Sequence, residues 1–352
     1  MHKNGINIPI NVIYSEVISK LGNYSKWETL KTDSYFKYRR KWKENPANNI
    51  VERFPLNLDI EPTNACNLKC PFCYRSIAIE NNHYTFKKTG NMPLDLFKSI
   101  LEQITLDGIC MVPAIKLTRR GEPLLCKDIV KMIAMAKDAG VIDVIMNTNA
   151  TLLTEDLSEQ IIDAGVDKIL FSFDAPEKEV YEKIRIGADF ESTLHNILKF
   201  VEIRNKKQAW GTLIRVGMVI TEETAPYVED FKLMFEPIAD IISYNRVYKE
   251  IVVSDNGNFL DNDNIIHNIN EICFACSYLW QRITINCYGN AEIYCESHKQ
   301  EVQLGNIKEM PIEEIWRGKE IESFRDYHHK GKWQQIQQCS KCSMPHMGKE
   351  QQ

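Results

Sequence analysis

Short apolar runs alternate with amphipathic segments between residues 54 and 246, and this alternation constrains the fold more than any other feature of the chain. Apolar runs of this length are typical of buried strands, whereas apolar residues that recur every three or four positions lie on one face of a helix. The six runs cover residues 54–60, 111–117, 143–147, 168–173, 213–220 and 238–244. Successive strand–helix units predict an α/β fold with a parallel sheet, and six units predict an open, partial (βα)6 TIM-like barrel rather than a closed one.

The boundaries of the helical segments carry their own signals. Gly140 and Gly165 each follow such a segment, where a left-handed residue commonly ends a helix. Thr154 precedes an acidic pair and is a suitable N-cap. In a parallel sheet of this kind the chemistry lies at the carboxyl ends of the strands, so motifs at those positions are the first candidates for a functional site.

The composition of the chain changes along its length and predicts its domains. A polar segment with a basic stretch, residues 1–53, is expected to form a helical extension. The barrel is expected over residues 54–246 and an Asp/Asn-rich linker over 247–272. A small cysteine-rich domain over 273–346 and a tail, 347–352, complete the predicted organisation.

Charge and hydropathy exclude two classes of partner. The formal net charge is −5 with a pI near 6.0, which gives no basic excess for nucleic acid. No apolar run approaches the roughly 18 residues that a membrane span needs. The first residues have no apolar signal core, so a cytoplasmic protein is expected. The chain has 11 cysteines, and in a reducing compartment grouped cysteines indicate metal ligands rather than disulfides.

The first cysteine group lies directly after the first predicted strand. Cys66, Cys70 and Cys73 have the spacing C-x3-C-x2-C. Three thiolates on one loop can hold three irons of a cubane cluster, which leaves the fourth iron open to a cofactor or substrate. The alternative is a structural zinc site that takes its fourth ligand from elsewhere in the chain.

This motif, with the aromatic Phe72 before its last cysteine, resembles the signature of the radical S-adenosylmethionine superfamily. The resemblance implies that the amino and carboxylate groups of S-adenosylmethionine chelate the open iron, and that Phe72 belongs to the cofactor site. It further implies that one electron, from a donor such as flavodoxin or ferredoxin, cleaves the cofactor to a 5′-deoxyadenosyl radical.

A second stretch matches the same superfamily after the second predicted strand. Residues 120–123 read Arg-Gly-Glu-Pro, where the family usually has Gly-Gly-Glu-Pro. The resemblance implies that Glu122 accepts hydrogen bonds from the cofactor ammonium group, a charge-assisted contact. Arg120 departs from the pattern, and the hypothesis for it is a cation near the cofactor carboxylate or the substrate.

Three further residues lie at or after later strand ends. The resemblance implies that Asn149 and Ser172 hold the ribose and methionine parts of the cofactor, and that Arg185 contacts its carboxylate. Taken alone, each residue favours a capping or turn role, and only their common location at strand ends makes the cofactor role an equal alternative.

The second cysteine group resembles the auxiliary-cluster extension known as SPASM, or its shortened form, twitch. The resemblance implies one auxiliary [4Fe-4S] cluster held by four ligands and a small β-hairpin that turns at residues 288–290. The implied ligands are Cys276, Cys295, Cys339 and Cys342. A zinc ribbon is the alternative, because it too is built from separated cysteine pairs.

Spare cysteines allow a further hypothesis. Enzymes of this kind that invert a stereocentre need a hydrogen donor on the face opposite the radical, and Cys273, Cys287 and Cys126 are the candidates. The alternative for each is a small buried hydrophobe without a chemical role.

The resemblance predicts an oxidoreductase that dehydrogenates or epimerises a sugar, an aminocyclitol or a similar small molecule. A maturase of ribosomally made peptides is the second candidate, although the polar residues 1–53 look too short for a leader-binding domain. An iron–sulfur electron carrier is the third, but a carrier needs no open iron beside a cofactor contact.

Overall fold

The structure is a computed structural model of the full chain. It describes residues 19–21, 23–80, 88–246, 258–260, 266–268, 276–293 and 302–340.

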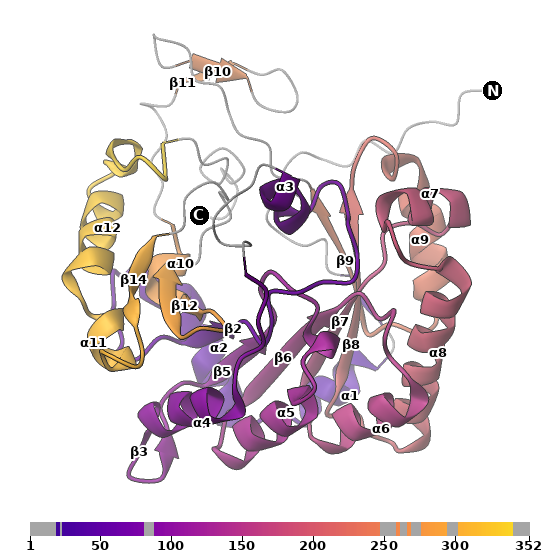
Figure 1. Ribbon diagram of the computed structural model, residues 1–352, viewed down its shortest axis with the longest axis horizontal. Helices are drawn as coiled ribbons and strands as arrows, with labels where there is room; N and C mark the ends of the chain where they lie inside the picture. Colours follow the sequence, from indigo (N-terminus) through magenta and orange to yellow (C-terminus); the bar gives the residue numbers. More distant parts are fainter. Residues whose placement is uncertain are drawn as a thin grey trace.

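One ten-stranded sheet runs through the molecule (Figure 1). Its centre consists of the parallel strands β2 (Asn57–Ile60), β5 (Ala114–Leu117), β6 (Asp143–Thr148), β7 (Lys168–Ser172), β8 (Leu213–Ile220) and β9 (Ile241–Arg246). These strands lie side by side in chain order, so each strand–helix unit adds its strand next to the preceding one. The short strand β1 (Ser19–Lys20) pairs antiparallel with β9 at one edge. The predicted partial barrel is therefore confirmed.

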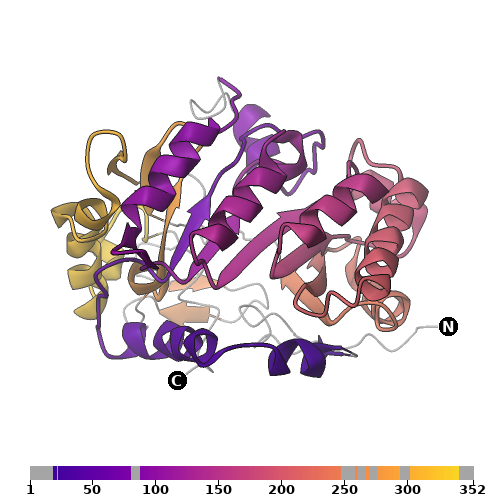
Figure 2. The same ribbon diagram turned by 90° about the horizontal axis from the view of Figure 1, so that it is seen from below.

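Helices cover one face of this sheet (Figure 2). They are α4 (Leu94–Gln103), α5 (Ile129–Asp138), α6 (Glu155–Asp163), α7 (Lys178–Ile184), α8 (Phe190–Lys206) and α9 (Val228–Phe235). The apolar strand residues and the inner helix faces form one large core cluster. The predicted helix ends are confirmed: Gly140 and Gly165 have φ of +89° and +87°, and the Thr154 hydroxyl accepts a hydrogen bond from Leu157 N–H at 3.1 Å.

The opposite face of the sheet is polar. Successive side chains of a strand point to opposite faces, so the residues between those packed on the helices point away from them. Most of them are polar, namely Asn57, Asp59, Lys116, Asp143, Asn147, Lys168, Ser172, Arg215, Ser243 and Thr284, and the apolar Ile145, Leu170 and Val219 lie among them. Ion pairs cross this face between neighbouring strands, for example Lys168 Nζ with Asp143 Oδ2 at 2.5 Å.

Two N-terminal helices, α1 (Tyr24–Thr29) and α2 (Asp33–Ala47), lie on that opposite face, across the sheet from α4, α5 and α6 (Figure 2). Their aromatic side chains form a second core cluster with strand residues that point away from the outer helices, among them Ala114 and Leu213. The predicted helical extension thus lies against the polar side of the partial barrel and covers part of it.

The C-terminal segment extends the same sheet. Strand β12 (Arg282–Ile285) pairs parallel with β2, and β13 (Asn290–Ile293) and β14 (Gln303–Asn306) follow in antiparallel order. The predicted hairpin turn between β12 and β13 is confirmed, with Gly289 at a φ of +93°. The helices α10 (Tyr278–Gln281), α11 (Ile312–Trp316) and α12 (Lys319–His329) pack beside it.

The predicted linker, residues 247–272, is described only over two short strands, β10 (Asn258–Leu260) and β11 (Ile266–Asn268), which pair with each other. A second small hairpin, β3 (Thr105–Leu106) with β4 (Ile109–Cys110), follows α4.

Candidate functional site

The three motif cysteines lie on the loop between β2 and α3 (Tyr74–Glu80), at the carboxyl edge of the sheet. The loop curls tightly, because Cys73 N–H donates to the Cys70 carbonyl at 3.0 Å. Leu68 N–H points at Cys66 Sγ at 3.5 Å. Besides burial, the charge of Cys73 helps to raise the pKa of the Cys66 thiol, and those of Cys73 and Cys66 help to raise the pKa of the Cys70 thiol.

The chemistry of these thiols fits a cationic iron–sulfur cluster. Burial, more than any other effect, raises the pKa of the Cys70 thiol to about 11 and also raises that of Cys66. Thiolates crowded in a poorly solvated loop need positive charge to be stable, and a coordinated metal ion deprotonates its thiol ligands. Three thiols on one loop can therefore hold three irons and leave one open.

Gly121 brings the second motif against this loop. A Cβ atom at Gly121 would lie 2.1 Å from the Thr63 carbonyl oxygen and 2.5 Å from that of Ala65. Only glycine permits this approach of two backbones. The next amide, Glu122 N–H, donates to the Ala65 carbonyl at 2.8 Å. The loop that carries the cysteines is thus fastened to the end of β5.

The Glu122 carboxylate is buried and faces several donors. Its Oε1 accepts from the Thr148 hydroxyl at 2.6 Å and from Leu124 N–H at 3.1 Å. Its Oε2 accepts from Asn149 N–H at 2.8 Å. Burial raises the pKa of Glu122, and these hydrogen bonds oppose the rise. A carboxylate has about four acceptor positions, so Oε2 can accept one more donor, such as an ammonium group.

Asn149 connects this carboxylate to the cysteine loop. Its side-chain oxygen accepts from Thr151 N–H at 3.0 Å, which is an Asx turn. Its side-chain nitrogen donates to Asn67 Oδ1 at 3.0 Å, and Asn67 lies next to Cys66 in the sequence. The turn role of Asn149 is thus seen in the structure, and its side chain also contacts the residue that follows Cys66.

Arg185 contacts the cysteine loop. Its Nε donates to Asp174 Oδ2 at 2.5 Å, and one terminal nitrogen lies 3.8 Å from Cys70 Sγ. Its guanidinium carbon is 5.7 Å from the centre of the Phe72 ring. Ser172 ends β7 on the polar face of the sheet, two residues before Asp174. Phe72, Glu122, Asn149 and Arg185 thus lie at the cysteine loop, whereas Ser172 is placed only at the end of β7. Asp174, which accepts the hydrogen bond from Arg185, was not singled out in the sequence.

Arg120, for which the sequence suggested a cation near the cofactor carboxylate or the substrate, forms ion pairs with two parts of the molecule. Its Nε lies 3.0 Å from Glu61 Oε2, at the end of β2, and it forms an ion pair with Glu292 of β13. All three side chains are buried. Neither carboxylate was singled out in the sequence, because nothing local marks them as partners.

The described part of the second cysteine group brings Cys276 and Cys339 to one histidine. Cys276 N–H donates to His328 Nδ1 at 3.1 Å, and His328 Nε2 lies 3.4 Å from Cys339 Sγ. The other two predicted ligands, Cys295 and Cys342, lie outside the described residues. His328 was missed in the sequence, where its position on a helical face offers only a weak signal.

The spare cysteines have different surroundings. Cys126 is buried in the main core cluster, where its carbonyl accepts from Ile129 N–H at 3.1 Å. Cys287 is also buried and lies beside Glu61, and burial is the main cause that raises its pKa to about 12. Cys273 lies outside the described residues.

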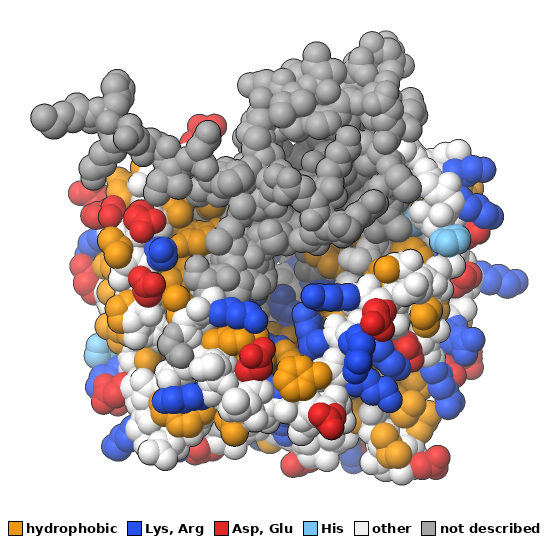
Figure 3. All heavy atoms as spheres, turned by 180° about the vertical axis from the view of Figure 1, so that it is seen from behind, with side chains coloured by type: hydrophobic (Ala, Val, Ile, Leu, Met, Phe, Trp, Pro, Cys, Tyr) orange, Lys and Arg blue, Asp and Glu red, His pale blue; other side chains and the backbone are white. Residues whose placement is uncertain are grey.

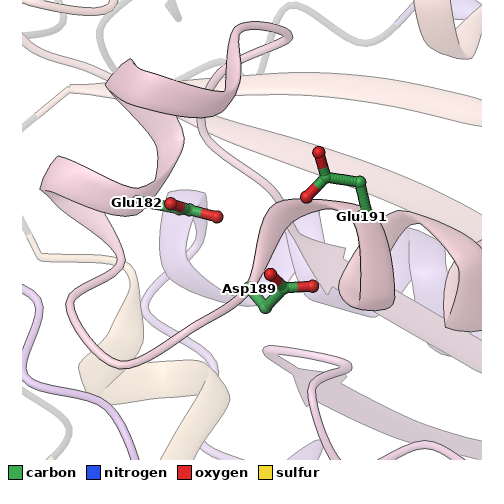
Figure 4. A group of neighbouring side chains, drawn as sticks. All are labelled: Glu182, Asp189 and Glu191. Carbon is green, nitrogen blue, oxygen red and sulfur yellow. The ribbon is translucent and has the colours of Figure 1, made fainter.

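A cluster of three carboxylates, Glu182, Asp189 and Glu191, lies at the start of α8 (Figure 4). Asp189 caps that helix by accepting from Ser192 N–H at 2.8 Å. Lys178 Nζ lies 2.7 Å from Glu191 and 3.8 Å from Glu182. Capping and ion pairing account for this cluster.

Comparisons with known proteins agree with this arrangement. The model of the radical SAM superfamily matches residues 60–232, and that of the SPASM iron–sulfur cluster-binding domain matches residues 276–343. Across the described residues, no helix has the length and hydrophobicity that crossing a bilayer demands.

Relatives fall into two groups. A probable GTP 3′,8-cyclase of Methanocaldococcus jannaschii is 32% identical over 42% of this chain, and the match spans only 46% of that cyclase. An S-adenosyl-L-methionine-dependent 2-deoxy-scyllo-inosamine dehydrogenase of Niallia circulans is 24% identical over 82% of this chain and 93% of its own length. Among solved structures, anSMEcpe with bound AdoMet and Kp18Cys peptide has a TM-score of 0.56 and 18% identity, covering 84% of this chain and 91% of that one.

Proposed function

Because this chain belongs to the radical SAM superfamily and carries a SPASM iron–sulfur domain, we propose that this radical SAM enzyme removes hydrogen from a carbon atom of a small polar molecule such as a sugar or an aminocyclitol. The observation that carries the proposal is the polar face of the sheet, where Ser172, Arg215 and Ser243 lie on neighbouring strands. Side chains of this kind bind hydroxyl and amino groups through hydrogen bonds.

Two further observations support a polar substrate. Seen from the side of α1 and α2, the molecule is hollowed near its centre, and Lys and Arg side chains gather around the hollow (Figure 3). The Niallia circulans relative, which matches most of this chain, is a dehydrogenase of 2-deoxy-scyllo-inosamine.

When bound, the first cluster and S-adenosylmethionine would supply a carbon radical that takes a hydrogen atom from the substrate. The auxiliary cluster would supply an acceptor for the electron that remains. The chain's own residues hold and orient these groups. Cys66, Cys70 and Cys73 hold the first cluster, and Glu122 and Arg185 face the two charged groups of the cofactor methionine. Asn149, Phe72 and Ser172 complete the cofactor site. An external protein such as flavodoxin or ferredoxin supplies the electron.

The auxiliary site takes Cys276, Cys295, Cys339 and Cys342 as ligands of one [4Fe-4S] cluster. Four protein ligands leave no iron open for substrate. The electron that remains on the substrate carbon, together with a proton from its hydroxyl group, must leave to give a ketone. The auxiliary cluster, with every iron bound to a protein ligand, would suit this role of electron acceptor.

Epimerisation is the related outcome, and it needs a thiol rather than a thiolate. Burial raises the pKa of both thiols, Cys126 and Cys287, and so keeps both protonated. Cys287 suits this role better than Cys126 because of its position, beside Glu61 at the end of β2. Cys273 remains a candidate. A Cys287→Ala variant that still inverts its substrate, with deuterium from D2O in the product, would remove Cys287 from this role.

The experiment that tests the function is cofactor cleavage in the presence of candidate substrates. The anaerobically purified, reconstituted and reduced protein is mixed with S-adenosylmethionine and, separately, with polyols, aminocyclitols and peptides, and 5′-deoxyadenosine is measured by mass spectrometry. The Cys66→Ala variant is the control. We expect polyols or aminocyclitols to stimulate formation of 5′-deoxyadenosine and to be oxidised. Stimulation by peptides alone would favour the maturase, and a protein with both clusters that cleaves no cofactor with any of them would favour the electron carrier.

A further inference from the structure

His328 connects the two described cysteines of the auxiliary site. It lies in the last turn of α12 and is only 3% exposed. Its Nδ1 is 3.1 Å from the Cys276 amide nitrogen, and its Nε2 is 3.4 Å from Cys339 Sγ. One imidazole ring therefore spans a backbone amide and a sulfur from segments far apart in the sequence.

The hydrogen bond from the Cys276 amide to Nδ1 determines whether Nε2 donates or accepts at Cys339. A backbone N–H can only donate, so Nδ1 must carry a lone pair and cannot carry a proton. The ring is then neutral with its proton on Nε2, since a neutral imidazole has one donor and one acceptor nitrogen. Nε2–H consequently points at Cys339 Sγ as a hydrogen-bond donor. The distance of 3.4 Å suits a bond to the large sulfur atom.

The helix that carries His328 is itself fastened in place. Arg325, one turn earlier, donates from Nε to the Leu279 carbonyl at 2.9 Å and from a second nitrogen to the Trp316 carbonyl at 3.0 Å. These bonds tie α12 to α10 and α11. The imidazole is therefore oriented before any metal group binds.

We propose that His328 is a positioning residue that donates its Nε2–H to the Cys339 sulfur and thereby raises the reduction potential of the auxiliary iron–sulfur cluster. The inference rests on the proposed role of Cys339 as a ligand. A hydrogen bond to a ligand sulfur withdraws negative charge, and the reduced cluster carries more of that charge than the oxidised one. The hydrogen bond therefore stabilises the reduced cluster more than the oxidised one, which raises the reduction potential.

Two amide variants separate the two contacts of the ring. His328→Asn keeps an oxygen near the position of Nδ1 but offers no donor at the position of Nε2. His328→Gln extends an amide N–H toward the position of Nε2. Both are made in the full-length chain with Cys66, Cys70 and Cys73 replaced by Ala, so that the auxiliary cluster alone gives the electron paramagnetic resonance signal during a redox titration.

We expect His328→Asn to lower the equilibrium constant for reduction about tenfold, a midpoint potential about 59 mV more negative for one electron. His328→Gln is expected to stay close to the parent protein. Equal midpoints in all three proteins would overturn the proposal, and so would equal losses in both variants or loss of the cluster from both.

A measurement on the unsubstituted residue stands apart from the variants. Pulsed resonance of the reduced protein labelled with ¹⁵N-histidine should show a weak nitrogen coupling together with an exchangeable proton. A strong coupling, as from nitrogen bound to iron, would overturn the proposal, and so would the absence of any coupling. Iron analysis of Cys339→Ala tests the ligand assignment separately, because a full auxiliary cluster in that variant would contradict the proposed function rather than the hydrogen bond alone.

Discussion

At the scale of single residues, the closest constraint is the approach of Gly121 to the cysteine loop. A methyl group there would meet two backbone carbonyl oxygens, at 2.1 and 2.5 Å, and neither can rotate away. We expect Gly121→Ala to displace the loop, to cost about 1–3 kcal/mol in the free energy of unfolding and to remove most of the iron of the first cluster. Iron analysis after reconstitution and urea unfolding measure both effects.

Gly211 is the matched control for this substitution. It has no atom within 4 Å of an added Cβ and no positive φ, so Gly211→Ala should leave iron content and stability as they are. Full iron content in the Gly121→Ala protein would show that the cysteine loop can accept a methyl group at this position, contrary to the prediction.

Glu122 is the second residue on which the site depends. In Glu122→Gln an amide NH2 group replaces one oxygen and meets the N–H and O–H donors that the carboxylate now accepts. We expect the dissociation constant of S-adenosylmethionine to rise at least tenfold, about 1.4 kcal/mol, as measured by calorimetry on the reconstituted protein. Glu179→Gln, at an exposed position of α7, should bind the cofactor as the parent does. Equal affinity in both variants would rule out Glu122 as a cofactor contact.

At the scale of elements, the aromatic side of α1 and α2 stabilises the polar face of the sheet. Trp27 is only 2% exposed and packs edge-on against Tyr35, whereas Leu30, three residues on, is 58% exposed. We expect Trp27→Ala to lower the free energy of unfolding by about 3–5 kcal/mol and Leu30→Ala by about 0.5 kcal/mol or less. Urea unfolding distinguishes them, and similar values for the two would mean that these helices do not pack on the sheet.

The sequence predicted the order of these elements better than their contacts. Periodicity located the central strands because each is a short apolar run, and Gly140, Gly165 and Thr154 ended or began helices as their backbone preferences require. It showed α1 and α2 only as polar helices. The spacing of Tyr35, Tyr38 and Trp42 by three and four residues, a helical stripe, was the signal that these helices cover a surface.

At the scale of the whole molecule, one buried arginine joins the barrel to the C-terminal strands. Arg120 lies between Glu61 and Glu292, and β12 pairs with β2 beside it. Such a contact could not be predicted from the sequence, because its carboxylates come from strands whose pairing depends on the whole fold. The cysteine motifs could be predicted, because each is local in sequence.

The arginine bridge predicts a pH-dependent loss of stability. Arg120→Met leaves two buried carboxylates without their cation, at a cost of about 3–5 kcal/mol. Burial already raises the pKa of Glu61 and Arg120 opposes that rise, so the variant's folded state binds more protons than its unfolded state. Stability then falls as pH rises, and we expect a larger loss at pH 8 than at pH 6 in urea unfolding.

The companion variant tests the cause. In Arg120→Met with Glu61→Gln one of the carboxylates is neutral, so part of the loss at pH 8 should be regained. If the single variant loses the same free energy at both pH values, packing of the side chain rather than its charge is what joins the two parts.

In the proposed function, a carbon-bound hydrogen of a small polar substrate passes to the cofactor-derived radical. The most direct test uses polyols and aminocyclitols with deuterium on their carbon atoms, incubated with the reduced holoenzyme and S-adenosylmethionine, and mass spectrometry of the 5′-deoxyadenosine. We expect one deuterium in the 5′-deoxyadenosine and an equal amount of product oxidised or inverted at the labelled carbon. Unlabelled 5′-deoxyadenosine with every such substrate, alongside label transfer from a deuterated peptide, would contradict it.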